Sequence, residues 1–139
     1  DVYKRQSQYP FAVGLTIMNW ISIGAINMAV AVACGAFAAH GLKPRLSAEQ
    51  MAWWQTGTQY FFYHALGLLI VGMLLRINLT SPTIAWVMQL GIVLFTGSLY
   101  LMALGMPRWL GAITPIGGTL FIIAWIWLAI SVAKHTSSI

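Results

Sequence analysis

Four long apolar runs dominate the pattern of hydrophobic and polar positions along the chain. They cover residues 11–39, 58–75, 83–104 and 109–133, and none of them contains a formally charged side chain. A transmembrane α-helix needs about 20 consecutive, mostly apolar residues. The runs are too long and too uniformly apolar for the alternating strands of a membrane β-barrel. The pattern therefore predicts an all-α membrane protein with four transmembrane helices.

The polar segments that connect the later runs are short. Residues 76–82 contain Ser81 followed by Pro82, the arrangement of a helix N-cap with proline in the first turn. Residues 105–108 form a Gly-Met-Pro-Arg turn. Short connections place successive helices side by side and antiparallel. We expect an up-down four-helix bundle that forms a single domain over residues 7–139.

The connection between the first and second runs predicts an additional short helix. Ser47 and Gln50 form a capping-box pattern, which marks a helix start. The pair Trp53-Trp54 would lie in the membrane interface, where tryptophan is enriched, and Gly57 would allow a bend into the second span. One continuous helix over residues 48–75 is the alternative.

The first six residues, Asp1 to Gln6, are set apart from this domain. Their peptide can be encoded by GATGTGTATAAGAGACAG, which matches the transposon end used in preparing sequencing libraries. We interpret residues 1–6 as a disordered adapter artefact and leave them out of the fold. A genuine basic N-terminal tail is the alternative interpretation.

The composition supports a membrane location and excludes several classes of function. Of the 139 residues, 60% are hydrophobic and 6% are charged, whereas a soluble domain carries about a quarter charged residues. The basic residues are too dispersed for a nucleic-acid surface. The single cysteine excludes an internal disulfide and a multi-cysteine metal site.

The basic residues near the span ends do not decide the orientation under the positive-inside rule. They are Lys43, Arg45 and Arg108 on one side, and Arg76 and Lys134 on the other.

Small residues predict where the helices pack. Lipid is as apolar as leucine, so close approach of small side chains must help to hold the helices together. The first span carries two rows of small residues at four-residue spacing, and the third and fourth spans carry glycines. The rows are Ala25, Ala29 and Ala33, and Ala31, Gly35 and Ala39; the glycines are Gly91, Gly97, Gly117 and Gly118.

A proline inside the fourth span predicts a helix kink. Pro115 has no amide hydrogen to donate to the carbonyl of Gly111, so the helix should bend there. Thr114 and the pair Gly117-Gly118 lie beside it. A structural kink is favoured over a binding site at this position.

Five polar residues form the candidate functional cluster: His40, Glu49, Tyr60, His64 and Thr114. His64 lies within the second span, where a titratable residue faces the bundle interior and is a functional candidate. Tyr60 shares its helix face, so a buried hydrogen bond between the tyrosine and the histidine is the alternative to a working site. His40 closes the first span, where a histidine can bond the last helix carbonyls. Glu49 is the only carboxylate outside the first six residues, so paired-carboxylate catalysis and a Ser-His-Asp triad are excluded within one chain. No spacing selects a metal site, and no cofactor is expected.

Four ordered stretches carry a family resemblance. They are residues 35–42 (GAFAAHGL), 55–60 (QTGTQY) with His64 following, 94–100 (LFTGSLY) and 110–118 (LGAITPIGG). In this order they resemble the small bacterial inner-membrane proteins of the YgdD/YwdK type, a domain-of-unknown-function family. The resemblance covers about residues 19–133. It implies four transmembrane helices in the bacterial plasma membrane, with both termini expected in the cytoplasm, and it implies no activity, substrate or catalytic residue.

We expect a non-enzymatic interaction or accessory protein, because the spans hold few ionisable groups and many packing residues. The expected partners are the lipid bilayer and another membrane protein or a second copy of the chain, and not nucleic acid. The alternative is a permeation path for protons or a small polar solute, lined by His64, Tyr60, Thr114 and the kink at Pro115. The second alternative is an enzyme or metal-binding protein that uses His40 and His64. Convergence of these side chains on one cavity would favour the alternatives, and dispersal would favour interaction.

Overall fold

Four long helices make up most of the computed structural model, which describes the backbone of residues 10–137 and the side chains of residues 19–137. They are α2 (Pro10–Phe37), α3 (Ala48–Arg76), α4 (Pro82–Ala103) and α5 (Thr114–Thr136). Two short helices, η1 (Ala38–Leu42) and η2 (Arg108–Ala112), follow α2 and precede α5. Within the described residues there is no strand. The interpretation of residues 1–6 as an artefact concerns a segment outside the described residues.

The predicted number of membrane spans is confirmed. Four helical segments in the described part of the chain are long and apolar enough to cross a membrane: residues 19–42, 48–76, 82–103 and 108–136. The boundaries differ most at the second span, which begins at Ala48 rather than at Thr58. The predicted start of α4 is correct, because the Ser81 hydroxyl accepts a hydrogen bond from the Thr83 amide and Pro82 occupies the first turn.

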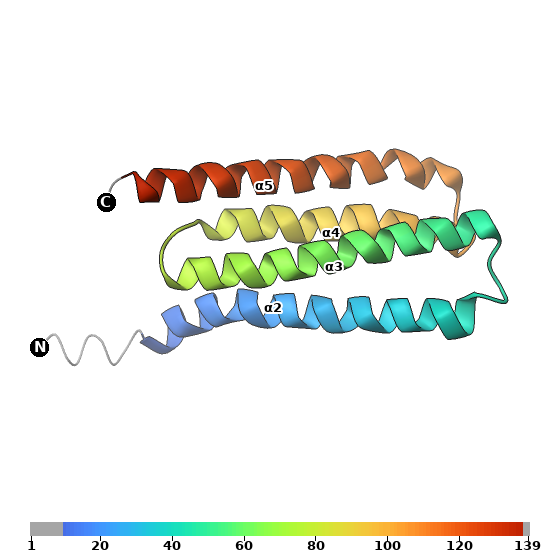
Figure 1. Cartoon of the computed structure of the whole chain (residues 1–139), viewed down its shortest axis with the longest axis horizontal. Coiled ribbons are helices and arrows are strands. Elements are labelled where there is room, and N and C mark those ends of the chain that lie inside the picture. Colours follow the sequence, from blue (N-terminus) through green and yellow to red (C-terminus); the bar gives the residue numbers. More distant parts are fainter. Residues whose placement is uncertain (1–9, 138–139) are drawn as a thin grey trace, which may run out of the picture.

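The helices α3 and α4 form the centre of the molecule. In Figure 1 they lie side by side between α2 and α5, and α2 begins at the end of the molecule where α5 ends. Each helix packs chiefly against the next helix of the chain. The largest fully buried side chains all come from α3 and α4: Leu68, Val71, Ile84 and Met88. The two central helices therefore supply the core, and α2 and α5 cover it from outside.

The helix α3 is continuous where a short interfacial helix and a bend were predicted. Its capping box is present, since the Ser47 hydroxyl accepts from the Gln50 amide and the Gln50 side chain accepts from the Ser47 amide. No break occurs at Gly57. A β-carbon there would lie 3.0 Å from a ring carbon of Tyr100 on α4, and Thr96 donates to the Gly57 carbonyl at 3.2 Å. The glycine therefore serves close packing of α3 on α4 and not a bend.

Pro115 lies in the first turn of α5 and not in the interior of a helix. Residues 108–112 form the 3₁₀ helix η2, and the α-helix begins at Thr114. In a first turn the missing amide hydrogen of proline costs nothing, because that amide has no partner within the helix. A change from 3₁₀ to α-helix around Ile113 thus replaces the predicted kink.

The first span ends in a π-helical turn that the sequence pattern did not indicate. In η1 the amide of Lys43 donates to the carbonyl of Ala38, five residues earlier, at 3.1 Å. Such a turn is wider than an α-helical turn and is rare in proteins. Here it leads the chain out of α2 into the connection that ends at Ser47.

Two glycines bring α2 and α3 into backbone contact. A β-carbon on Gly24 of α2 would lie 2.9 Å from the backbone nitrogen of Leu69 on α3. A β-carbon on Gly72 of α3 would lie 2.9 Å from the backbone nitrogen of Ile21 on α2. Each glycine thus faces the backbone of the other helix, and neither position was identified from the sequence.

The glycine contacts between α4 and α5 agree only in part with the predicted packing. Gly117 of α5 lies against the backbone of Phe95 on α4, whereas Gly118 is in ordinary contact with the Phe95 ring. A β-carbon on Gly97 would have no described neighbour within 4 Å, so this glycine is not a packing point. In the predicted alanine rows, Ala31 is fully buried, while Ala25, Ala29 and Ala33 are exposed.

We expect Gly117→Ala to lower the free energy of unfolding by about 2 kcal/mol, because the new methyl group would overlap the backbone of Phe95. Gly97→Ala on α4 is the matched control, since its methyl group meets nothing within 4 Å. Unfolding in detergent micelles, followed by circular dichroism, measures both. Equal stability of the two variants would contradict the close contact of α4 with α5.

Candidate functional site

His64 is the most deeply placed titratable residue of the candidate cluster. It is 4% exposed, which confirms that it faces the interior. Its Nδ1 donates to the backbone carbonyl of Tyr60 at 2.7 Å, and the indole N–H of Trp125 on α5 donates to its Nε2 at 3.0 Å. The ring also stacks on Phe121 of α5, with ring centroids 3.4 Å apart and planes 8° apart.

These two hydrogen bonds fix the tautomer of the imidazole. Because Nε2 accepts the Trp125 N–H, the ring proton lies on Nδ1, which donates to the Tyr60 carbonyl. Both nitrogens are therefore engaged within the bundle. A metal ion or a substrate would have to displace one of these partners, so the histidine serves here as a link between α3 and α5.

Tyr60 lies near His64, but its hydroxyl is not the partner of the imidazole. The tyrosine is 39% exposed, and its ring stacks at 6.2 Å from the His64 ring. The ring also packs on Phe95, with centroids 4.6 Å apart. His64 thus bonds to the backbone carbonyl of Tyr60, and the alternative of a hydrogen bond between the two side chains is wrong.

The other three candidates lie in separate surroundings. His40 is exposed in η1, at the end of α2. Glu49 forms an ion pair with Arg108 at 3.1 Å at the surface of the molecule. Thr114 donates to the Ser98 hydroxyl at 2.6 Å, because the Ser98 proton is directed to the Phe95 carbonyl. The five residues therefore do not converge on one site.

A buried aromatic cluster joins α2, α3 and α4 and was missed by the sequence reasoning. Trp54 stacks on Tyr100, with ring centroids 3.9 Å apart, and its indole N–H donates to the Cys34 carbonyl at 3.0 Å. The Thr58 hydroxyl donates to the Trp54 carbonyl, so the Tyr100 hydroxyl donates to Thr58 at 2.6 Å. Trp54 thus packs inside the bundle, at 5% exposure, and not at its surface.

An amide pair connects α2 to α4. The side-chain nitrogen of Asn27 donates to the side-chain oxygen of Gln89 at 2.8 Å, and the reciprocal bond measures 3.2 Å. Asn27 also donates to the Ile23 carbonyl of its own helix. Asparagine and glutamine in apolar spans are hydrogen-bonding residues between membrane helices, and that signal would have identified the pair.

Two grooves open on the side of the bundle that carries α2. One, of about 540 Å³, lies between the end of α2 and the start of α3, and Lys43, Gln55 and Phe62 are among its lining residues. The other, of about 380 Å³, lies between α2 and α4 and contains the amide pair Asn27 and Gln89. Neither groove is lined by His64.

We expect His64→Ala to lower the free energy of unfolding by about 3 kcal/mol, since it removes two hydrogen bonds and leaves a cavity against Phe121. Trp125→Phe should cost about 1 kcal/mol, because it removes only the donor to Nε2. His40→Ala, at an exposed position, is the control and should change stability by less than about 0.5 kcal/mol. Thermal unfolding in micelles ranks the three; no loss in His64→Ala would contradict a linking role.

We expect the Asn27–Gln89 pair to contribute about 0.6 kcal/mol of coupling, the average for hydrogen bonds between membrane helices. A double-mutant cycle with Asn27→Ala and Gln89→Ala, measured by unfolding in micelles, gives this value. Strictly additive effects would mean that the two amides do not depend on each other.

Comparison with known proteins places the chain in a family. The model of the family described as "Protein of unknown function (DUF423)" matches residues 34–118. A UPF0382 membrane protein of Staphylococcus epidermidis is 48% identical over 116 residues, which are 83% of this chain and 95% of the relative. The UPF0382 membrane protein YwdK of Bacillus subtilis is 46% identical over 119 residues, 84% of this chain and 97% of the relative. No solved structure is significantly similar. The chain therefore belongs to the DUF423 family and is a multi-pass protein of the bacterial plasma membrane, as the resemblance to the YgdD/YwdK type implied.

Proposed function

We propose that the protein acts without catalysing a reaction, as a small accessory protein that associates in the bilayer with another membrane protein or a second copy of itself. The observation that supports this best is the dispersal of the candidate polar residues. His64 bonds to Tyr60 and Trp125, and Thr114 bonds to Ser98. A polar residue whose hydrogen-bond partners lie within its own bundle contributes to packing, and it has few donors or acceptors left to bind a substrate.

The outer helices offer the surface for such an association. In their most apolar stretches, 22% of residues are buried in the first and last spans, against 50% in α3 and 44% in α4. Large apolar side chains cover the exposed faces, among them Val32 on α2 and Ile126 on α5. These faces meet lipid or another transmembrane helix, and both surroundings accept them.

The proposal includes an up-down arrangement of the four spans, with the first turns of α3 in the membrane interface. The order of the helices in Figure 1 supports it, since α2 begins where α5 ends. The ion pair of Arg108 with Glu49 is largely exposed, and the Arg108 guanidinium lies 5.6 Å from the ring centroid of Trp53. Charged groups with such exposure belong in water or among headgroups, where a tryptophan is also favoured.

The two alternatives have less support. A permeation path needs His64, Tyr60 and Thr114 to line one passage, and Thr114 is bonded to Ser98 at the junction of α4 and α5 instead. A metal site needs several ligands within reach of one ion. Within the described residues no three His, Cys, Asp or Glu side chains are placed to hold a metal together.

A proton-flux assay separates association from permeation. We expect purified protein in liposomes to dissipate a pH jump no faster than empty liposomes, because both nitrogens of His64 are bonded inside the bundle. Faster dissipation by the wild type that disappears in a folded His64→Ala variant would contradict the proposal. It would make permeation the leading function.

Crosslinking in intact bacterial membranes tests the association directly. Cysteine is introduced at Val32 or Ile126, both exposed on outer helices, in a Cys34→Ser background. We expect a covalent adduct of discrete mass from at least one of these positions, and none from Leu68→Cys, which is fully buried. Absence of an adduct at both exposed positions would count against an accessory role.

A further inference from the structure

The larger groove, between α2 and α3, has a polar mouth and an apolar floor. Its mouth is formed by Lys43 and Gln55, and its floor includes Gly35, Ala38 and Phe62. A β-carbon on Gly35 would lie 3.6 Å from the Thr58 methyl group and 3.8 Å from the Phe62 ring. A methyl group at residue 35 would therefore be in ordinary contact with Thr58 and Phe62, and a larger side chain there would occupy space on the floor.

The mouth and the floor lie at different depths along the span. The apolar segment of the first span ends at Leu42, so Lys43 is the first residue beyond it. Gly35 precedes Lys43 by eight residues, which correspond to about 12 Å along a helix. A groove that begins at the end of a span and continues for that distance passes from headgroup depth to the upper acyl chains.

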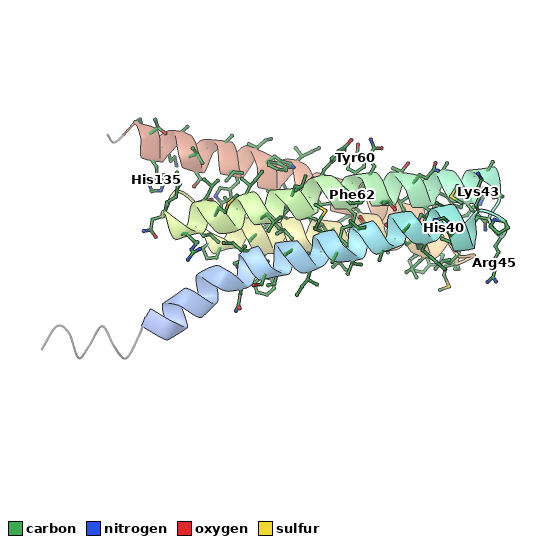
Figure 2. The ribbon with its side chains drawn as sticks, turned by 60° about the horizontal axis from the view of Figure 1, so that its bottom comes forward. His40, Lys43, Arg45, Tyr60, Phe62 and His135 are labelled. Atoms are coloured by element: carbon green, nitrogen blue, oxygen red, sulfur yellow. The ribbon has the colours of Figure 1, made fainter. Side chains whose placement is uncertain are left out.

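Basic side chains outnumber acidic side chains at this end of the molecule. Figure 2 shows His40, Lys43 and Arg45 together at the C-terminal end of the first span, where the chain passes from η1 toward α3. All three are exposed. The single ion pair found within the described residues joins Arg108 to Glu49, so the one carboxylate nearby is already neutralised. Lys43 and Arg45 are left to attract an anion.

The wall of the groove is held in place by bonds within the protein. Trp54 donates to the Cys34 carbonyl, Thr58 is bonded to Trp54 and Tyr100, and Gln59 donates to the Tyr63 hydroxyl at 2.7 Å. The Gln55 amide, in contrast, has no hydrogen-bond partner among the described residues and lines the same groove as Lys43. The groove is thus preformed and keeps a cation and a free amide donor at one end.

We propose that this groove binds an anionic phospholipid. The phosphate would be held by Lys43 and the Gln55 amide, with Arg45 adding long-range attraction, and one acyl chain would follow Gly35, Ala38 and Phe62. The basic mouth favours an anionic over a zwitterionic headgroup, because the positive charge of Lys43 attracts a net negative headgroup. The apolar floor favours a lipid over a free phosphate, because a soluble anion would gain nothing from it.

Native mass spectrometry of the full chain in detergent tests the proposal, with phosphatidylglycerol as the probe. We expect Lys43→Gln to weaken phosphatidylglycerol binding about fivefold, the effect of one basic residue near an acidic headgroup. Lys134→Gln is the matched control, since Lys134 is an exposed lysine near the end of α5, away from the groove. Gly35→Leu fills the floor and should weaken phosphatidylglycerol binding at least tenfold while the charge is unchanged.

Two further arms distinguish the source of the anion. Phosphatidylcholine should bind at least fivefold more weakly than phosphatidylglycerol to the wild type, and glycerol 3-phosphate should not compete. Competition by glycerol 3-phosphate would overturn a lipid site in favour of a phosphate site. Equal loss in Lys43→Gln and Lys134→Gln would overturn the groove as its location. Thermal unfolding of each variant verifies that it is folded, and Lys43→Gln changes an exposed side chain, so it keeps the test decisive if Gly35→Leu does not fold.

Discussion

Direct backbone contact between helices is the interaction on which this bundle depends. In a bilayer, burying leucine against leucine gains little over leaving it in lipid, so a helix pair must gain dispersion energy from closer approach than bulky side chains allow. Gly24 and Gly72 give this approach between α2 and α3, and Gly117 gives it between α4 and α5. These contacts fix the spacing of the helices, and the aromatic cluster, the amide pair and both grooves are arranged around that spacing.

The same surroundings govern the polar side chains. A polar group that lies in hydrocarbon without a hydrogen-bond partner costs several kcal/mol. Two or three such groups would therefore cost about as much as the whole free energy of unfolding of a small domain. Within the described residues, only the Thr80 hydroxyl is buried without a partner. His64, Thr58, Ser98 and Thr96 all bond to neighbours inside the bundle. The buried polar side chains of this protein are therefore explained first by the hydrogen bonds that they make within the bundle.

The sequence predicted the number of helices, their caps and the inward position of His64, because length, apolarity and capping residues are local properties. It did not predict which faces meet. Spans that are apolar on all sides carry no stripe that marks the packed face, so the exposed alanine row of α2 and the buried Gly24 could not be told apart. Trp54 and Pro115 were misplaced for a related reason. Both have a local preference, for an interface and for a kink, that the packing of α3 on α4 and the 3₁₀ turn of η2 override.

The π-helical turn η1 has a consequence for the direction in which α2 ends. A turn closed over five residues holds about one residue more than an α-helical turn, and one residue corresponds to a rotation of about 100°. The residues that follow the π-helical turn are therefore rotated about the helix axis by about that angle, relative to an uninterrupted α-helix. This rotation places Lys43 at the mouth of the groove. An uninterrupted α-helix through positions 38 to 42 would have nearly the same length and the same hydropathy. It would nevertheless point the lysine at a different neighbour, so the register of this turn, rather than the apolar content of the span, sets where the positive charge of this end is delivered.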